Sequence, residues 1–237
     1  MVAIQSSVKV HPLAKKRRWT FIVLTALLLI VSIASLMIGP VRFSLTEIWH
    51  GLTVADSSLE RRVIWELRFP RVLVGMLVGA CLAIAGAILQ AIMRNPLADP
   101  GIIGVSSGAG IAAITIMIIF PAYITLLPLA AFLGALITAL LIYLLAWKGG
   151  ATPVKIVLVG VAVNAIVGAG TNALMLLYSD RVQAALPWLS GGIAGVGWSH
   201  FQLIVYYAIG AIIISMFSVK YIRVLRLGDD VAKLLGH

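Results

Sequence analysis

Charged residues are scarce in this 237-residue chain. Asp, Glu, Lys and Arg make up 11% of it, whereas hydrophobic residues make up 62%. A globular protein of this size needs many more polar side chains to cover its surface, so the composition excludes a water-soluble domain. The single cysteine, Cys81, excludes an intramolecular disulfide and a multi-cysteine metal site.

Six long apolar runs contain no Asp, Glu, Lys or Arg. They are residues 21–38, 72–93, 101–120, 122–147, 156–178 and 201–219. At about 1.5 Å of rise per residue, helices of such lengths match a hydrocarbon core of about 30 Å. The sequence therefore predicts an all-α, polytopic membrane helix bundle, with a transmembrane domain of six helices over residues 21–219. Residues 1–20 are predicted to form an N-terminal tail and residues 220–237 a C-terminal segment.

The basic residues favour one orientation of this bundle. With the N-terminus in the cytoplasm, the inner segments carry twelve Lys and Arg residues and the outer segments carry six. Because cytoplasmic loops are enriched in Lys and Arg, we predict that the N-terminus and residue 237 are both cytoplasmic. The net charge of +10 is scattered between the apolar runs, so we expect membrane lipid around the chain and no nucleic-acid partner.

The apolar runs also lack the groups that ion coupling and hydrolysis require. Carriers driven by protons or sodium usually hold an ionisable side chain near the bilayer midplane, so the charge-free runs disfavour such a carrier. The sequence contains no His-Glu-x-x-His pair and no Gly-x-x-x-x-Gly-Lys-[Ser/Thr] loop. We therefore predict no catalytic residue, no metal site and no cofactor bound by this chain. A driving force then has to come from a partner.

Small and amide residues recur every four positions in the fifth apolar run. They are Gly160, Asn164, Gly168 and Asn172. A spacing of four places them on one face of a helix. An amide that faces lipid is costly, so this face is expected to meet protein or water. Helix packing and the lining of a transport pathway both stay open.

A turn between the second and third apolar runs is rich in proline and glycine. It reads Asn95-Pro-Leu-Ala-Asp-Pro-Gly101. Pro96 and Pro100 are expected to stop the second helix and to force a sharp turn. Irregular backbone at this depth survives only where protein or a water-filled cavity covers it. A short tight turn and a movable constriction are both compatible with this pattern.

Five motifs follow one another in a specific order. They are Arg68-Phe-Pro-Arg71, the run from Gly79 to Gln90, the segment from Asn95 to Gly110, Trp188-Leu-Ser-Gly-Gly192 and the run from Leu227 to Gly236. In these motifs the chain resembles the permease subunits of bacterial ABC importers for ferric siderophores, haem and vitamin B12. The resemblance extends from about residue 60 to the end. It implies a type II importer fold of about ten helices, so a chain with six is predicted to be C-terminally truncated or a fragment.

The resemblance also implies roles for individual residues. Arg68 and Arg71 resemble arginines that dock a soluble substrate-binding protein, with plain interfacial anchoring as the alternative. Asn95, Pro96, Leu97, Thr152 and Pro153 resemble the cytoplasmic gate, and Asn164, Gly168 and Asn172 resemble pathway-lining positions. Leu227, Gly228, Asp229, Asp230, Leu234 and Gly236 resemble a helix that couples to the ATPase, with an ordinary amphipathic segment as the alternative.

The implied function is that of a permease subunit in the bacterial cytoplasmic membrane. It would move an iron-siderophore complex, or haem or cobalamin, into the cytoplasm. The implied protein partners are a second permease subunit, identical or related, a cytoplasmic ATPase dimer that binds ATP and Mg, and an extracytoplasmic substrate-binding protein. Two other functions stay open: a carrier or channel that works without ATP, and an inactive remnant that serves as a membrane scaffold.

Overall fold

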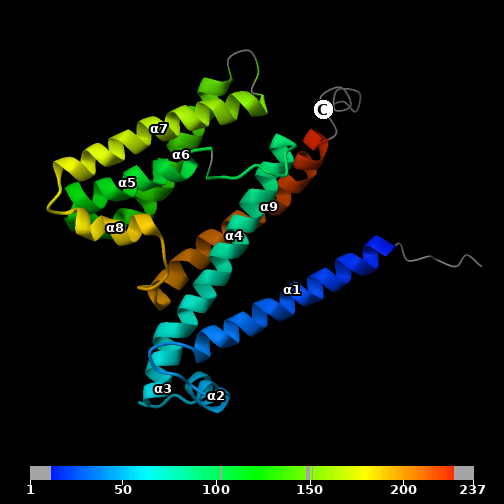
Figure 1. Cartoon of the computed structure of the whole chain (residues 1–237), viewed down its shortest axis with the longest axis vertical. Helices are drawn as coiled ribbons and strands as arrows, with labels where there is room; N and C mark the ends of the chain where they lie inside the picture. The colour runs from blue at the N-terminus through cyan, green and yellow to red at the C-terminus, as the bar shows by residue number, and fades with distance from the viewer. Residues whose placement is uncertain (1–11, 102, 148–149, 151, 227–237) are drawn as a thin grey trace, which may run out of the picture. The chain divides into compact units, whose positions relative to one another are not determined.

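A computed structural model describes residues 12–101, 103–147, 150 and 152–226 (Figure 1). Over these ranges the regular structure is helical and no residue lies in a β-strand, which confirms the all-α fold. The elements are α1 (Pro12–Met37), α2 (Leu45–Thr53), α3 (Leu59–Arg61), the π-helix η1 (Arg62–Arg68), α4 (Phe69–Met93), α5 (Val105–Ile119), the 3₁₀-helix η2 (Pro121–Leu126), α6 (Leu127–Ala146), α7 (Pro153–Leu177), α8 (Val182–Ser190) and α9 (Trp198–Arg226).

Five helical stretches in the described ranges are long and apolar enough to cross a membrane. They are Lys15–Met37, Leu59–Met93, Pro121–Ala146, Pro153–Leu177 and Trp198–Ile222. The sixth predicted segment, 101–120, is helical only over the 15 residues Val105–Ile119. Pro100, Gly101, Ile103 and Gly104 lie in turns, and Phe120 leaves the helical region with φ −121°. At about 1.5 Å per residue, α5 is therefore shorter than the hydrocarbon core.

The chain folds as two compact units. In the described ranges, the first unit comprises residues up to 76 together with 196–203, and the second comprises residues 77–195 together with those from 204 onward. Both α4 and α9 contribute to each unit, because the boundaries at 76 and 203 fall within these helices.

The core of the first unit lies where α1, α2 and η1 meet. Leu36, Phe43, Ile48 and Ile64 form a buried cluster there. α2 begins at Ser44 with a capping box, in which the Ser44 hydroxyl accepts from the Glu47 N–H and the Glu47 carboxylate accepts from the Ser44 N–H. This box fixes the direction in which the chain enters α2 and turns Ile48 into the cluster.

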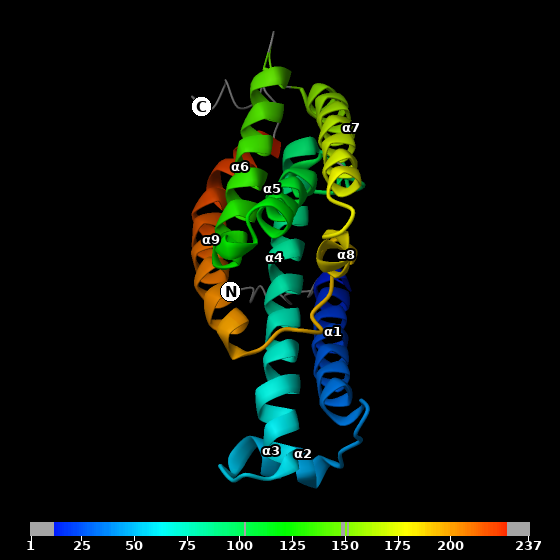
Figure 2. The same ribbon diagram turned by 90° about the vertical axis from the view of Figure 1, so that its left-hand side faces the viewer.

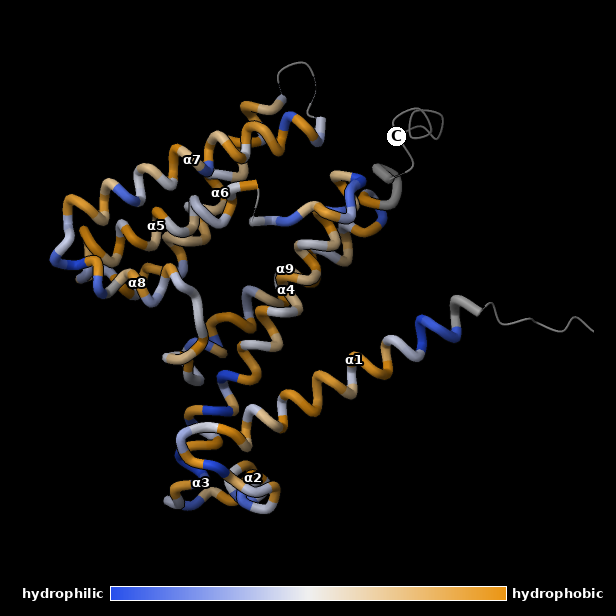
Figure 3. Tube along the Cα trace, viewed as in Figure 1, coloured by the Kyte–Doolittle hydropathy of each residue, from blue (hydrophilic) through white to orange (hydrophobic). Residues whose placement is uncertain are grey.

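α1 buries little of its surface. Most of its side chains are exposed, and Figure 3 shows a helix that is hydrophilic at its N-terminal end and hydrophobic along most of its length. The basic residues Lys15, Lys16, Arg17 and Arg18 occupy the hydrophilic end. A helix that is apolar on every side suits a lipid environment, with its basic end at the headgroups.

The second unit is built on α5, α6 and α7, which lie side by side in Figures 1 and 2. α5 crosses α6 at two glycines: a Cβ added to Gly108 would lie 2.6 Å from the carbonyl oxygen of Gly134. Absent side chains at such a crossing let two helix backbones approach closely. On another side of α5, Ile114 and Ile118 pack against the fully buried Ala185 of α8.

Candidate functional site

The connection from α4 to α5 begins with a residue in the left-handed region. Arg94 has a φ of +50°. The N–H of Asn95 donates to the carbonyl of Gln90 at 3.2 Å, which closes the last turn of α4. A residue with positive φ after the last helical turn is a common helix terminator, and Pro96 keeps the helix from resuming.

Two side chains in this connection hold its backbone in tight turns. The Asn95 Oδ1 accepts from the N–H of Leu97 at 2.9 Å, and the Asp99 Oδ1 accepts from the N–H of Gly101 at 2.7 Å. Asn and Asp favour such turns because their short side chains reach the backbone two residues on. The connection is thus a shaped segment, and the carboxylate of Asp99 helps to shape it.

Glycines bring the end of this connection against α7. Gly104 has a φ of +88°, and a Cβ there would lie 3.0 Å from the carbonyl oxygen of Gly160 and 3.3 Å from the Cβ of Asn164. A Cβ on Gly160 would lie 2.5 Å from the carbonyl oxygen of Ile103. The two backbones can meet only because both positions are glycine.

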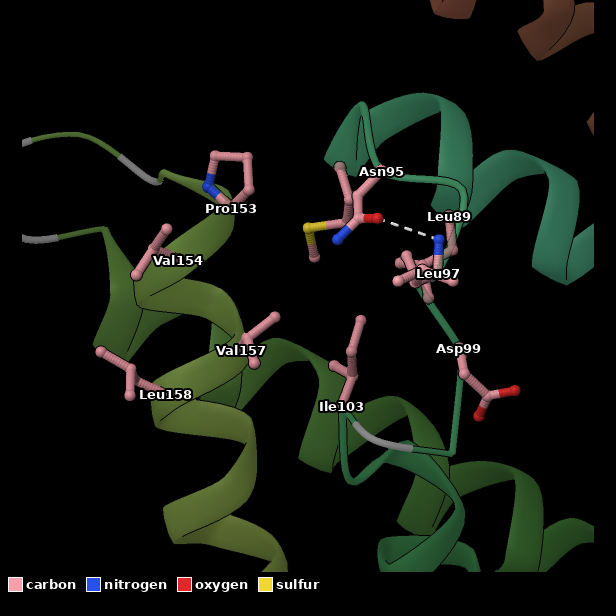
Figure 4. Close-up of a pocket in the computed structure, with 11 residues that line it drawn as sticks. Leu89, Asn95, Leu97, Asp99, Ile103, Pro153, Val154, Val157 and Leu158 are labelled. Atoms are coloured by element: carbon pink, nitrogen blue, oxygen red, sulfur yellow. Dashed lines mark hydrogen bonds between the residues drawn. The ribbon is translucent and has the colours of Figure 1, made fainter.

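A pocket of about 420 Å³ lies between this connection and the first turns of α7 (Figure 4). Three of the five residues predicted for the gate, Asn95, Leu97 and Pro153, line it. They come from segments more than fifty residues apart in the sequence. Asp99 also lines the pocket, but in Figure 4 its carboxylate points away from α7, and the α7 side of the pocket is bordered by apolar groups alone.

The other two predicted gate residues lie beside this pocket. Pro96 lines a neighbouring pocket of about 440 Å³ with Gln90 and Arg94, and Asn95 borders both pockets. Thr152 caps α7: its hydroxyl accepts from the N–H of Lys155 at 3.4 Å, and Pro153 occupies the first turn, where proline is favoured. The structure thus brings the two halves of the predicted gate together, while gating itself stays a prediction.

Seven apolar residues of the first pocket were not among the sequence predictions. They are Leu89, Met93, Ala98, Ile103, Val154, Val157 and Leu158. Val154, Val157 and Leu158 share one face of α7, as their spacing of three and four residues requires. In an apolar helix, the sequence alone cannot distinguish a face that lines a pocket from one that faces lipid.

The predicted stripe on α7 is divided between two environments. Gly160 is buried against the connection, whereas Asn164 and Asn172 are exposed. A Cβ on Gly168 would meet nothing within 4 Å in the described part of the chain. The Gly160 end of the stripe therefore packs against the connection, and the rest of the stripe is accessible. That Asn164, Gly168 and Asn172 line a pathway stays a prediction.

The two arginines predicted to dock a soluble protein differ in their surroundings. Arg68 is only 8% exposed and donates to the carbonyls of Leu36, at 2.6 Å, and Val41. Arg71 is partly exposed, and its Nε is buried without a hydrogen-bond acceptor among the described residues. Arg68 is thus occupied by the protein's own backbone, whereas Arg71 has a donor that still lacks a partner.

The remaining site predictions concern metals and the C-terminal segment. In the part of the chain that the structure describes, no three His, Cys, Asp or Glu side chains gather as a metal site would require. The residues predicted to couple to an ATPase, from Leu227 to Gly236, lie outside the described residues.

Comparisons with known proteins give a consistent result. The chain matches the model of the FecCD transport family over residues 27–237. It is 34% identical to the iron(3+)-hydroxamate import system permease protein FhuG of Bacillus subtilis (strain 168), over 89% of this chain and 65% of that protein. It is 36% identical to the vitamin B12 import system permease protein BtuC of Vibrio cholerae serotype O1, over 94% of this chain and 66% of that protein.

A solved structure agrees with these relatives. It is described as an inward-facing conformation of a metal-chelate type ABC transporter, and it superimposes with a TM-score of 0.74 at 26% identity. The superposition covers 92% of this chain and 68% of that one. The chain therefore spans about two thirds of the length of the relatives that it matches. With its apolar helices, these matches show that the chain is a multi-pass cell-membrane protein that belongs to the FecCD transport family.

Proposed function

We propose that the chain is the membrane-spanning permease subunit of an ATP-driven importer for a metal chelate, with an iron-siderophore complex as the first candidate and haem or cobalamin as alternatives. The names of its relatives, which include iron(3+)-hydroxamate, Fe(3+)-citrate and vitamin B12 permeases, support a metal-chelate substrate. The observation that carries the proposal is the pocket at which the connection after α4 faces the start of α7.

The chemistry of this pocket suits the passage of a bulky chelate. Its walls are mostly hydrocarbon, with the Asn95 amide and the Asp99 carboxylate as the polar groups, and the Asp99 carboxylate accepts from the Gly101 N–H of its own backbone turn. A pathway with few fixed charges allows a polar complex to move without being trapped by a strong ion pair. Leu97 is 83% exposed beside the pocket, a costly state for a leucine, so we expect it to be covered in another conformation.

The gate then works as a two-state packing of the connection against α7. Asn95, Pro96 and Leu97 move relative to Thr152 and Pro153, and Asn164, Gly168 and Asn172 line the route beyond. An ATPase dimer, which binds ATP and Mg, grips the segment from Leu227 to Gly236 and biases the two states. The soluble binding protein delivers the chelate at the outer face of the membrane, at the arginine-rich start of the helix that contains Arg68 and Arg71. A second permease subunit completes the pathway.

Disulfide trapping tests the gate directly. Leu97→Cys and Val154→Cys, combined in a Cys81→Ala background, place two thiols on opposite walls of the same pocket. In membranes that contain the cognate ATPase, the rate of cross-linking should change by about tenfold between nucleotide-free and ATP-bound states, and the cross-link should stop uptake. Each single-cysteine variant is the matched control. Equal cross-linking in both states with uptake intact would reject a gate at this position.

The energy source distinguishes the importer from its alternatives. An importer should co-purify with an ATPase, and uptake of a ferric siderophore into vesicles should stop on ATP depletion and survive an ionophore. Uptake that survives ATP depletion but collapses with the ionophore would indicate an ATP-independent carrier. Binding of the ATPase without any uptake would indicate a scaffold.

A further inference from the structure

The short helix α2 is fixed at the ends of two membrane-crossing stretches. Ile48 of α2 lies in the buried cluster with Leu36, in the last turn of α1, and with Ile64 of η1. These two partners belong to the stretches Lys15–Met37 and Leu59–Met93. α2 therefore lies at the level where the first stretch ends and the second begins.

Further contacts hold α2 at this level. A Cβ added to Gly51 would lie 3.0 Å from the carbonyl oxygen of Glu60, so the two backbones are in direct contact. The Arg61 Nη1 donates to the carbonyls of Gly51, at 3.2 Å, and Leu52, at 3.3 Å. These carbonyls lie in the last turn of α2 and have no partner within the helix. One side of α2 is thus held by packing and by hydrogen bonds.

The length of α1 places this level at a membrane surface. Trp19 follows the four basic residues at the N-terminal end of α1 and is exposed. Basic and tryptophan side chains together are typical of the headgroup layer. From Trp19 to Met37, α1 rises about 27 Å at about 1.5 Å per residue, close to the hydrocarbon thickness of about 30 Å. An α1 that crosses the core thus reaches the opposite headgroup layer at about Met37, and α2 lies in that layer.

α2 carries an apolar strip that the described part of the protein leaves uncovered. Leu45 is 61% exposed and Trp49 is 71% exposed. They are four residues apart and therefore share one face of the helix. Leu45 also lies beside Leu52, which packs against the buried cluster, because seven residues make nearly two turns. The strip formed by Leu45 and Trp49 therefore borders the face that packs on the protein.

The rest of α2 is polar. The exposed residues on its far side are Thr46, Glu47, His50 and Thr53. The His50 Nε2 lies 3.7 Å from the carboxylate of Asp56, so this side carries its own polar contacts. α2 thus has a face packed on protein, a polar face and the apolar strip between them. A helix divided in this way is suited to lie along a membrane surface, with its polar face in water and its apolar strip against the acyl chains.

Two polar groups at this level match the chemistry of lipid headgroups. Among the described residues, the indole N–H of Trp49 has no hydrogen-bond acceptor, and the ring is exposed. A tryptophan in such a position can donate to a lipid phosphate or ester oxygen while its ring contacts hydrocarbon. Arg42, in the connection that enters α2, is also exposed, and its charge complements lipid phosphates.

We propose that Leu45 and Trp49 insert into the lipid headgroup layer and that α2 is an anchor that binds the membrane surface where α1 ends. In the predicted orientation this surface belongs to the outer leaflet. Through its packing on Leu36 and Ile64, the anchored α2 fixes the depth of both membrane-crossing stretches. The inference rests on the membrane location of the chain and is independent of the proposed function.

The accessibility of single labels to lipid and to water tests the anchor. In a Cys81→Ala background, Leu45→Cys, Trp49→Cys and His50→Cys each provide one thiol for a nitroxide label. The full chain is placed in vesicles of phosphatidylethanolamine and phosphatidylglycerol, and collisions of the label are measured with oxygen, which concentrates in lipid, and with a water-soluble nickel chelate. The ratio of oxygen to nickel collisions should be about threefold or more higher at positions 45 and 49 than at position 50.

His50→Cys is the matched control for this measurement. Position 50 directly follows Trp49, is exposed on the polar face and loses only a surface contact with Asp56. A ratio at positions 45 and 49 that is as low as at position 50 would show that the strip faces water, and it would overturn the anchor. Low collision rates with both reagents at positions 45 and 49 would show that another protein or a second copy of the chain covers the strip, and would overturn it too.

Exchange of Trp49 tests its own part in the anchor. The label at Leu45→Cys is compared between the Trp49→Phe and Trp49→Ser backgrounds. Phe keeps a large apolar ring and should leave the collision ratio at position 45 within about twofold of that with Trp49 intact, whereas Ser should lower it by about threefold or more. An unchanged ratio in Trp49→Ser would show that Trp49 does not hold α2 in the membrane surface. Uptake of any substrate plays no part in these measurements, so failure of the importer would leave the anchor in place.

Discussion

The backbone of Gly104 packs directly on the backbone of Gly160. A Cβ on Gly104 would lie 3.0 Å from the Gly160 carbonyl oxygen, and a Cβ on Gly160 would lie 2.5 Å from the Ile103 carbonyl oxygen. This contact sets the distance between α7 and the connection that ends at α5. It therefore sets the width of the pocket at the candidate gate.

Gly160→Ala should displace the connection from α7. The added methyl group meets backbone, which cannot rotate away, so we expect a loss of about 1–3 kcal/mol in stability and a marked loss of transport. Gly168→Ala, on the same helix, adds the same group where nothing lies within 4 Å and should not lower stability. Thermal unfolding in detergent and uptake into vesicles measure the two effects. Equal behaviour of both variants would contradict a packing role for Gly160.

The crossing of α5 and α6 gives a second prediction. Gly134→Ala brings a Cβ within 2.6 Å of the Cβ of Ala112, so the helices must separate. We expect a loss of about 1–3 kcal/mol, seen as a lower midpoint of thermal unfolding. Gly110→Ala in α5 is the control, because its Cβ would meet nothing within 4 Å. An unchanged midpoint for Gly134→Ala would show that this crossing is not tightly packed.

The turn at Asn95 depends on an oxygen acceptor. Asn95→Ala removes the acceptor for the Leu97 N–H and should cost about 0.5–1.5 kcal/mol of local stability. Asn95→Asp keeps an oxygen in place and should restore much of it. Hydrogen exchange at the Leu97 amide is the direct measure: faster in Asn95→Ala, nearly unchanged in Asn95→Asp. Slow exchange in Asn95→Ala would mean that the turn does not need this side chain.

The cap of α2 should depend on pH. Hydrogen bonds from the Ser44 side chain and backbone hold the pKa of Glu47 below its usual value. A carboxylate with a lowered pKa stabilises the folded state above its unfolded pKa, about 4.3, and this contribution is lost as the pH falls through the folded pKa. The difference in stability between the unaltered chain and Glu47→Gln should therefore be constant near neutral pH and should shrink in acid.

The fold was largely predictable because the thickness of the bilayer sets the length of the apolar helices that cross it. Each of the six charge-free runs contains a helix, from 21–38 in α1 to 201–219 in α9. The boundaries of 101–120 were wrong, since the turn hydrogen bonds of Asp99 and the positive φ of Gly104 shorten α5. Neither feature changes the hydrophobicity pattern from which the segment was predicted.

The candidate site was predictable in part. The resemblance indicated Asn95, Leu97 and Pro153, and the structure brings them to one pocket. The burial of Arg68 could not be foreseen, because an arginine beside a membrane helix is expected at an exposed interface. Its partners are the main-chain carbonyls of Leu36 and Val41. A sequence does not indicate which backbone carbonyls accept hydrogen bonds from a distant side chain.

Three arginines on the predicted outer side donate to the ends of helices. Arg61 binds the carbonyls of Gly51 and Leu52 at the end of α2, Arg68 binds Leu36 at the end of α1, and Arg181 binds Ile118 at the end of α5. The peptide dipoles there partly offset the positive charge of each side chain. Half of the six cations predicted to lie outside are thus complemented by the folded backbone. If the predicted orientation holds, the difference in positive charge between the two sides of the membrane is larger than a count of Lys and Arg residues indicates.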